Sequence, residues 1–313
     1  MRPRTCATLF TVASLTIANS SAAQLKGHYV PGFTGLQNGS MAPPGITVAV
    51  PWYFYTTDRI LDETGKAAAA SPRVNVSFTG LAVSWATNYK IGGARYGASI
   101  VPVAFIKSRI EGNSLDVPDS FSFTDIEVDP LSLVWESKQA DFIFNYAFFA
   151  PTGKWELGGR DNAGLGMWSN LFQTGTTVRL DSEGEWTISL LGSYEIHSKK
   201  KNTNIEVGDI ATFEGGIGKT FVKVSMIGNN NPVPTRILNL GIVSYGQLKM
   251  TDDKAGPITS LLTRDRVLAV GGEGDLILPL SGWVVGLRIE PEFGARNRTE
   301  GWMSLLTIAY SVQ

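Results

Sequence analysis

Residues 186–197 read WTISLLGSYEIH, and apolar and polar side chains alternate along most of this stretch. The apolar face of an extended chain would carry Trp186, Ile188, Leu190, Gly192, Tyr194 and Ile196. The polar face would carry Thr187, Ser189, Ser193, Glu195 and His197. Alternation with a period of two residues predicts a β-strand that is apolar on one side and polar on the other.

The same alternation recurs along the chain, with clusters of Gly, Asn, Asp and Pro between the repeats. We expect about 12 strands from this pattern. They lie near residues 44–56, 72–88, 92–108, 122–136, 139–150, 165–180, 183–197, 209–226, 235–249, 265–279, 282–294 and 301–313. Most of these segments exceed the roughly 9–11 residues that a tilted strand needs to cross a bilayer.

Two of these segments raise a question of register. In segment 72–88 the apolar positions shift from Val74, Val76 and Phe78 to Leu81, Val83 and Trp85. Because a bulge changes the face that later residues occupy, we expect a β-bulge at Gly80. In the next segment the residues expected to share one face are Tyr96, Ala98, Ile100, Ala104 and Ile106.

Composition helps to separate a membrane barrel from a soluble β-sandwich. Only 18% of the 313 residues are charged, whereas soluble domains average about 25%. Sandwich strands average about 5–6 residues, which is shorter than most segments here. Aromatic residues gather near several segment ends, as in the belts of membrane barrels. We therefore predict an all-β fold, a transmembrane antiparallel up-and-down β-barrel, and keep the sandwich as the alternative.

The beginning of the chain has the three parts of a secretory signal. Arg2 and Arg4 precede an apolar stretch over residues 7–18, and small residues follow at 21–23. We expect cleavage after Ala23, which would also remove Cys6, the single cysteine of the chain. The predicted organisation is a signal peptide at 1–23, a leader at 24–43 and an outer-membrane barrel at 44–313. No later stretch is apolar enough for a helical membrane span.

Charged residues within the strands indicate which side faces the lumen. An Arg or Lys facing lipid at the midplane costs about 2–4 kcal/mol. We therefore expect the lumen, or the rims, to hold Arg95, Lys107, Glu136, Asp141, Glu195, Glu214, Glu273, Asp275, Arg288, Glu290 and Glu292. These groups could pair with one another as lumen packing, or they could line a permeation path and set its polarity.

The leader at 24–43 is rich in glycine yet carries apolar side chains. His28, Tyr29, Phe33 and Leu36 are its candidate packing residues. Exposed to water, these apolar side chains would be unfavourable. We expect the leader to fold into the barrel mouth as a plug, and a free periplasmic tail is the alternative.

Several segments, taken in order, resemble a known family. They include residues 27–32 (GHYVPG), 43–45 (PPG), 124–130 (TDIEVDP), 150–154 (APTGK), 194–197 (YEIH) and 291–298 (PEFGARNR). Together they resemble the bacterial outer-membrane family assigned to the MetA pathway of phenol degradation, which is similar to long-chain fatty-acid transporter barrels. The resemblance implies an outer-membrane channel for small hydrophobic or aromatic compounds, with an N-terminal plug.

Little in the sequence points to catalysis or to a cofactor. The chain has no G-x-S-x-G motif, and its histidines are His28 and His197 alone. His197 and Ser198 are neighbours on a strand and so point to opposite faces. A barrel lipid hydrolase would need a serine from another strand within reach of a histidine. We predict no catalytic residues, no metal site and no cofactor.

The expected function is passive uptake of a small apolar solute through the outer membrane. Two alternatives remain: a structural or adhesive barrel with a filled lumen, and an outer-membrane lipid hydrolase. The expected partners are outer-membrane lipid, lipopolysaccharide and the outer-membrane assembly machinery. A net charge of −1 and the lack of a basic patch argue against nucleic acid.

Overall fold

The structure is a computed structural model that describes residues 27–67, 71–112, 117–159, 162–227, 231–254 and 264–312. Its strands are β1 (Gly45–Thr57), β2 (Ile60–Leu61), β3 (Arg73–Ile91), β4 (Ala94–Glu111), β5 (Val117–Phe123), β6 (Ile126–Glu136), β7 (Ala140–Ala150), β8 (Ser169–Arg179), β9 (Trp186–His197), β10 (Ile210–Ile227), β11 (Asn231–Lys249), β12 (Arg266–Leu278), β13 (Trp283–Arg296), β14 (Arg298–Thr299) and β15 (Trp302–Val312). The described residues form no helix that is long and apolar enough to cross a membrane.

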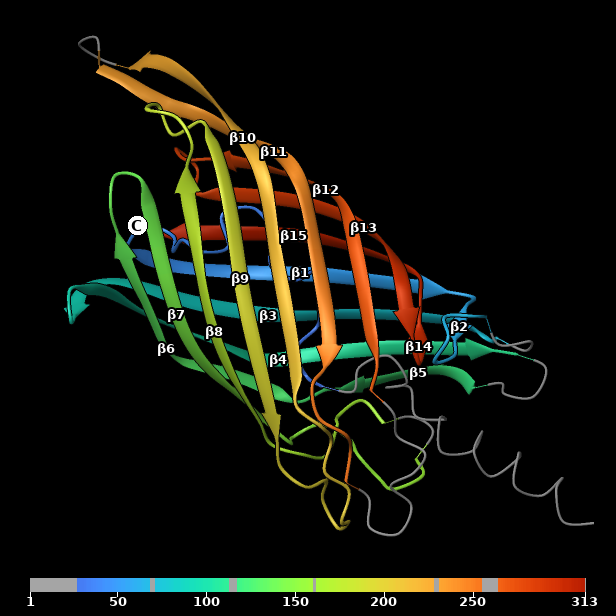
Figure 1. The fold of residues 1–313 in the computed structure, drawn as a ribbon. Helices are drawn as coiled ribbons and strands as arrows, with labels where there is room; N and C mark the ends of the chain where they lie inside the picture. The colour runs from blue at the N-terminus through green and yellow to red at the C-terminus, as the bar shows by residue number, and fades with distance from the viewer. Residues whose placement is uncertain are drawn as a thin grey trace, which may run out of the picture.

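The long strands form one closed antiparallel barrel (Figure 1). Each strand pairs with its neighbours in the chain, β1 pairs with β15, and pairing of β3 with β4 completes the ring. β5 and β6 both pair with β4 and occupy one position in the wall. The barrel therefore has 12 strands, as predicted.

The predicted strand at 122–136 is interrupted, because β5 ends at Phe123 and β6 begins at Ile126. The carboxylate of Asp125, in the break, accepts hydrogen bonds from the backbone amides of Gly153 at 2.8 Å and Leu165 at 2.7 Å. These bonds hold the break against the loop that follows β7. A polar anchor of this kind leaves no trace in the alternation of the sequence.

The two ends of the barrel differ in their connections. At one end the strands are joined by turns, such as residues 92–93 and 137–139, while the other end carries the segments 58–72, 151–168 and 198–209. Membrane barrels of outer membranes have short periplasmic turns and longer extracellular loops. For the outer-membrane barrel expected from the sequence, this rule assigns the turn end to the periplasm, and the two ends are named periplasmic and extracellular on that basis. Gly45 and Val312 also lie there, since Ile46 pairs with Val312.

Strand β9 follows the predicted alternation along its whole length. Thr187, Ser189, Ser193, Glu195 and His197 are buried, facing the inside of the barrel. The alternate side chains are exposed on the outside, among them Trp186, Ile188, Leu190 and Ile196. An apolar outer surface is what a wall in contact with lipid requires. The prediction of two chemically distinct faces is confirmed for this strand.

The prediction of a bulge at Gly80 is wrong in its position. β3 alternates without a slip at Gly80, since Val76 and Gly80 are buried and Leu81 and Trp85 exposed. The register shift lies on β4, where Leu81 pairs with Val103 but Val83 pairs with Ile100. The extra residue falls at Val101–Pro102 in the partner strand. Proline cannot donate to the ladder and is tolerated at such an irregularity.

The bulge corrects the predicted faces of β4. Ile100 is exposed before it, and Ala104 and Ile106 are buried after it, so these residues do not share one face. Lys107 follows Ile106 and is exposed on the outer face. The prediction that Lys107 faces the lumen is therefore wrong, because the bulge shifts the phase of the alternation.

The hairpin of β10 and β11 extends beyond the wall at the periplasmic end (Figure 1, upper left). Trp186, the first residue of β9, pairs with Lys219, and Ile237 is the first residue of β11 to pair with β12. Beyond these positions the two strands pair only with each other. This ribbon therefore lies outside the lipid-facing wall.

A pair of arginine substitutions tests which part of this hairpin contacts lipid. Ile242 in the wall and Met226 in the ribbon are both outwardly exposed, by 60% and 68%. We expect Ile242→Arg to lower the free energy of unfolding by about 2–4 kcal/mol, because the charge would face lipid. Met226→Arg should change it by less than about 0.5 kcal/mol, as at a water-exposed surface. Denaturant titration of the barrel in lipid vesicles measures both, and equal losses would contradict the assignment.

Candidate functional site

The lumen wall carries the charged residues predicted for it, apart from Lys107. The buried ones are Arg95, Asp141, Glu195, Glu214, Glu273, Arg288, Glu290 and Glu292. Glu136 pairs with Arg95 at 2.7 Å, with about half of its side chain exposed at the periplasmic end. Asp275 shares the inner face with Glu273 and is partly buried. Acidic groups thus predominate inside the barrel, and each buried carboxylate needs donors or a cation to be stable there.

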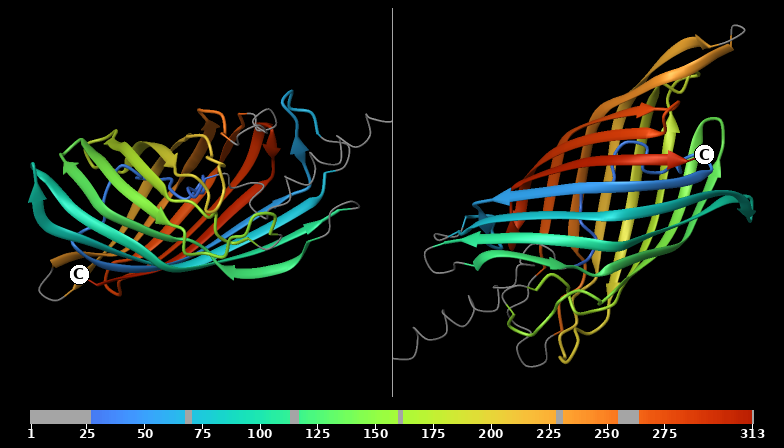
Figure 2. Two further views of the ribbon diagram at one scale, coloured as in Figure 1. Left: turned by 90° about the horizontal axis from the view of Figure 1, so that it is seen from below. Right: turned by 180° about the vertical axis from the view of Figure 1, so that it is seen from behind.

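The leader from Gly27 to Pro44 supplies many of these donors. It contacts Glu195, near the extracellular end of β9, and Arg95, near the periplasmic end of β4. The blue segment therefore lies inside the ring of strands (Figure 2, left). The leader crosses the lumen from the extracellular end to the periplasmic end and then continues directly into β1.

The extracellular end of the leader is held by His28. Its ring lies 2.7 Å from the hydroxyl oxygen of Ser169 and 2.8 Å from a carboxylate oxygen of Asp125, and it stacks on Phe149 at 4.7 Å between ring centroids. The backbone amide of His28 donates to Glu195 at 2.7 Å, and that of Tyr29 donates to the same carboxylate at 3.2 Å. Both ring nitrogens and the backbone amide of this histidine are thus engaged by residues outside the leader.

The middle of the leader wraps around the carboxylate of Glu214. This carboxylate accepts hydrogen bonds from the hydroxyl of Tyr29, from the amide of Gly32 at 2.5 Å and from the hydroxyl of Thr34 at 2.5 Å. Three donors from one segment satisfy a carboxylate that is otherwise enclosed by the wall. Gly32 adopts a φ of 81°, a conformation that glycine tolerates best.

The next turn of the leader meets an ion pair. Arg288 and Glu273 lie 2.8 Å apart, and the amide of Leu36 donates to Glu273 at 3.0 Å. Arg288 also donates to the carbonyl oxygen of Gly32 at 2.5 Å. Arg288 and Glu273 therefore each form a hydrogen bond with the backbone of the leader, in addition to their ion pair.

The periplasmic end of the leader is fixed by four further hydrogen bonds. The amide of Gly39 donates to the hydroxyl of Thr177 at 3.0 Å, and the hydroxyl of Ser40 donates to Asp141 at 2.7 Å. Arg95 donates to the carbonyl oxygens of Ala42 at 2.8 Å and of residue 41 at 3.3 Å. Asp141 is itself paired with Arg179 at 2.8 Å.

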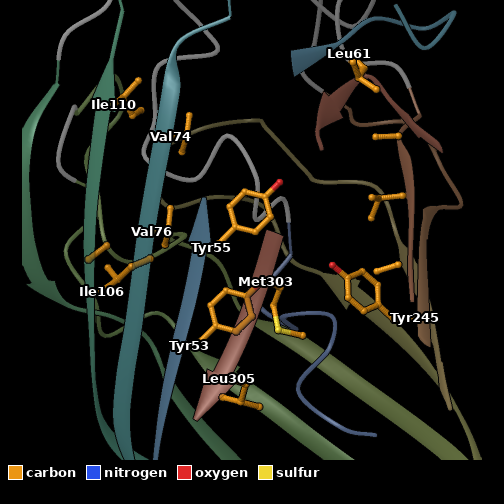
Figure 3. Close-up of a cluster of buried hydrophobic side chains, with 14 residues drawn as sticks. Tyr53, Tyr55, Leu61, Val74, Val76, Ile106, Ile110, Tyr245, Met303 and Leu305 are labelled. Atoms are coloured by element: carbon orange, nitrogen blue, oxygen red, sulfur yellow. The ribbon is translucent and has the colours of Figure 1, made fainter. Parts of the chain in front are cut away.

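An apolar cluster lines the inside of the wall toward the extracellular end. Figure 3 shows it, with side chains from β1, β3, β4 and β15 on one side and Tyr245 of β11 on the other. Its members are Tyr53, Tyr55, Leu61, Val74, Val76, Ile106, Ile110, Ala163, Tyr245, Val267, Ala269, Ala295, Met303 and Leu305. Val30 and Phe33 of the leader pack against it. Aromatic side chains at 53 and 55 thus face the lumen and not the lipid.

Polar atoms are set within this apolar surface. The hydroxyls of Tyr55 and Tyr245 donate to Glu292 at 2.6 and 2.9 Å. The hydroxyl of Tyr53 and both carboxylate oxygens of Glu290 are buried without a hydrogen-bond partner among the described residues. The cluster therefore combines packed apolar side chains with two buried polar groups that have no hydrogen-bond partner among the described residues.

The arrangement of Ser169, His28 and Asp125 has the residue types of a hydrolytic triad. It nevertheless differs from one that could act on a substrate, since Ser169 has 0% exposure and the ring of His28 is enclosed between its partners and Phe149. A nucleophile needs room for an acyl group at its oxygen. The geometry fits an anchor for the leader. Sequence analysis missed Ser169 and Asp125, because a lone serine or aspartate at a strand end has no distinguishing pattern.

Comparison with known proteins finds one matching family model and several solved structures of similar fold. The family model described as "Putative MetA-pathway of phenol degradation" matches residues 57–307. The crystal structure of an outer membrane channel from Pseudomonas putida F1 has a TM-score of 0.70 and 12% identity, and the match covers 91% of this chain and 100% of that one. The β domain of the Bordetella autotransporter BrkA has a TM-score of 0.48 and 11% identity, covering 86% and 100%. No curated protein matches in sequence.

Substitution of Gly39 tests how closely the leader is fitted to the wall. A Cβ at Gly39 would overlap backbone atoms of Thr176 in β8, which cannot move without disturbing the sheet. We expect Gly39→Ala to destabilise the anchored leader by about 1–3 kcal/mol, as overpacking does. Limited proteolysis of the folded barrel would then cut within residues 27–44.

The matched control for this substitution is Gly192→Ala, whose Cβ would make ordinary contacts with the ring of Phe213 at 3.6 Å and the carbonyl oxygen of Thr174 at 3.9 Å. It should leave the leader as protected as in the wild type. Protection of the leader in Gly39→Ala as well would show that the leader is not seated against β8.

The protonation of His28 makes leader anchoring depend on pH. Burial disfavours the charged ring, but hydrogen bonds and negative charges from Asp125 and Glu195 outweigh it, so the pKa of His28 is raised above 6.5. Glu127 and His197 also lie in this cluster. A raised pKa stabilises the folded state fully below the unfolded pKa of 6.5, and that contribution disappears as the pH rises through the folded pKa.

We therefore expect the stability difference between wild type and His28→Gln to shrink as the pH rises from below 6.5 through the raised pKa of His28. Free energies of unfolding measured across this range give the difference directly. A difference that stays constant with pH would mean that His28 is not charged in the folded barrel.

Proposed function

We infer that this chain, which belongs to the MetA-pathway of phenol degradation family, takes up small hydrophobic compounds passively through the outer membrane. Its barrel fold, which it shares with an outer membrane channel, supports that membrane as its location. The finer points of substrate and of direction are our proposal, and they rest on the chemistry of the lumen.

The observation that carries the proposal is the apolar cluster inside the extracellular half of the barrel. Water-filled barrels have polar interiors, whereas here Tyr55, Val76 and Met303 face inward among other apolar side chains. An apolar solute gains about 25 cal/mol for each Å² that it removes from water. This surface would therefore concentrate small apolar molecules at the entrance and would give a sugar or an ion no such gain.

The polar atoms of the cluster indicate a solute with one polar group. Tyr53 can donate or accept a hydrogen bond, and the carboxylate of Glu290 can accept one. Both have unused hydrogen-bonding capacity within the described residues. An aromatic ring bearing a hydroxyl would fill such a surface and satisfy one of these groups, as ligand sites commonly combine an apolar lining with few polar contacts.

The leader acts as a plug in this proposal. It fills the lumen below the apolar cluster through its contacts with Glu195, Glu214 and Glu273. Because these contacts run from one end of the barrel to the other, a solute that leaves the cluster for the periplasm must pass beside the leader or displace it. A barrel whose leader cannot be displaced or bypassed by a solute would instead be structural or adhesive, with a permanently filled lumen.

A reversible lock on the leader tests the proposal. Ser40→Cys with Asp141→Cys places two thiols where the native side chains are in hydrogen-bond contact, 2.7 Å apart. We expect proteoliposomes with the reduced protein to take up a radiolabelled aromatic alcohol faster than empty vesicles. Oxidation should slow this uptake several-fold, and a reductant should restore it.

The two single-cysteine variants are the controls, because they carry each substitution without the bond. A sugar of similar size should enter no faster than into empty vesicles. Equal uptake of sugar and aromatic alcohol would indicate a general pore. Uptake of neither, in any redox state, would indicate a structural barrel and overturn the proposal.

A further inference from the structure

The outer surface of the barrel carries a groove of about 660 Å³. It crosses β4, β3, β1, β15 and β13 near the ends of these strands that connect to the extracellular loops. Side chains that line it include Lys107, Arg109, Ser77, Phe54, Trp302 and Ser304. Most of its lining residues lie on the lipid-facing side of the wall. It also touches Tyr55, Val76, Ser108 and Met303, which are buried.

The lining residues form two rows across the sheet. Residues paired directly across neighbouring strands point to the same face. One row contains Lys107, Ser77, Phe54 and Ser304. The other row, closer to the extracellular loops, contains Arg109, Asn75, Thr56 and Trp302. Each row therefore begins at a cation and contains small polar side chains and one aromatic side chain.

Two cations on the lipid-facing side of a barrel require an explanation. In the middle of the wall this face is apolar, as at Ile242, Val270 and Leu287. A cation that faces lipid is costly near the midplane, and the cost falls toward the interface. Arg109 is paired with Glu111 on the same face. Lys107 and Arg109 stand one row apart, which puts both positive charges within reach of a single headgroup.

We propose that this groove binds a phosphorylated glycolipid of the outer leaflet, the lipid A portion of lipopolysaccharide. Its phosphate groups would lie against Lys107 and Arg109, since Lys and Arg are the side chains that recognise phosphate. Its acyl chains would lie along Phe54, Trp302 and Ile289, which are exposed apolar side chains of the same groove.

The position of the groove selects a lipid as its occupant. It opens from the membrane-facing surface, between side chains that are otherwise in contact with acyl chains. It also lies in the extracellular half of the wall, so the lipid belongs to the outer leaflet. The small polar side chains between the cations and the aromatics suit a sugar headgroup. Thr56 and Asn75 already hydrogen-bond each other at 2.8 Å, which fixes their orientation in the groove.

Native mass spectrometry of the purified barrel in detergent, titrated with purified lipid A, tests this site. We expect the wild type to bind one lipid A tightly. The double variant Lys107→Gln with Arg109→Gln should bind roughly 30-fold more weakly, from about 1 kcal/mol for each cation at an anionic surface. Dephosphorylated lipid A should bind the wild type as weakly as lipid A binds the double variant.

The matched control is Lys219→Gln, because Lys219 is an outward cation at the periplasmic end of the wall, over the ring of Trp186. It should bind lipid A like the wild type. The double variant Lys107→Arg with Arg109→Lys keeps both charges and should bind nearly as well. A mobility shift between unheated and boiled samples on gel electrophoresis confirms that each variant is folded.

Two results would overturn the proposal. The first is equal binding of lipid A by the Gln double variant and the wild type. The second is equal binding of lipid A and of a zwitterionic phospholipid to the wild type, which would leave an ordinary lipid contact. Neither result tests the lumen. The proposed transport function is tested separately, by the uptake measurements with the cysteine variants.

Discussion

The buried carboxylates of the lumen are the constraint on which the rest of this barrel depends. Glu195, Glu214 and Glu273 face an interior where an unpaired charge would be costly. A wall of alternating strands cannot supply donors to all of them, because its own backbone groups are used in the ladder. The leader supplies donors from its amides and hydroxyls. Wall and leader therefore stabilise each other.

This dependence divides the interior into two regions. The leader occupies the side of the lumen where the charges are, and its glycines let the backbone approach the wall closely, as at Gly32 and Gly39. The apolar cluster around Tyr55 and Met303 borders the leader toward the extracellular end. A solute that enters from outside meets the apolar region before it meets the charged contacts of the leader. The order of these regions is the structural basis of the proposed selectivity.

Much of the wall could be predicted from alternation alone, because a barrel strand must present different chemistry to lipid and lumen. All 12 strands and the inward placement of residues such as Glu195 and Arg288 follow from it. Alternation could not locate the bulge at Pro102, which inverted the face of Lys107, or the break at Asp125. It also could not tell that Tyr53 and Tyr55 face inward, since their strand is apolar on both sides. These failures occur where a tertiary contact or a proline overrides the period of two.

Amide hydrogen exchange of the wild-type barrel, resolved over residues 27–44, tests the central claim most directly. The amides of Gly32 and Leu36 donate to Glu214 and Glu273 inside the folded barrel. They should exchange orders of magnitude more slowly than an unstructured peptide, and at a rate near that of the wall strands. Exchange of these two amides at the rate of a free peptide, in a barrel whose strands stay protected, would contradict the account.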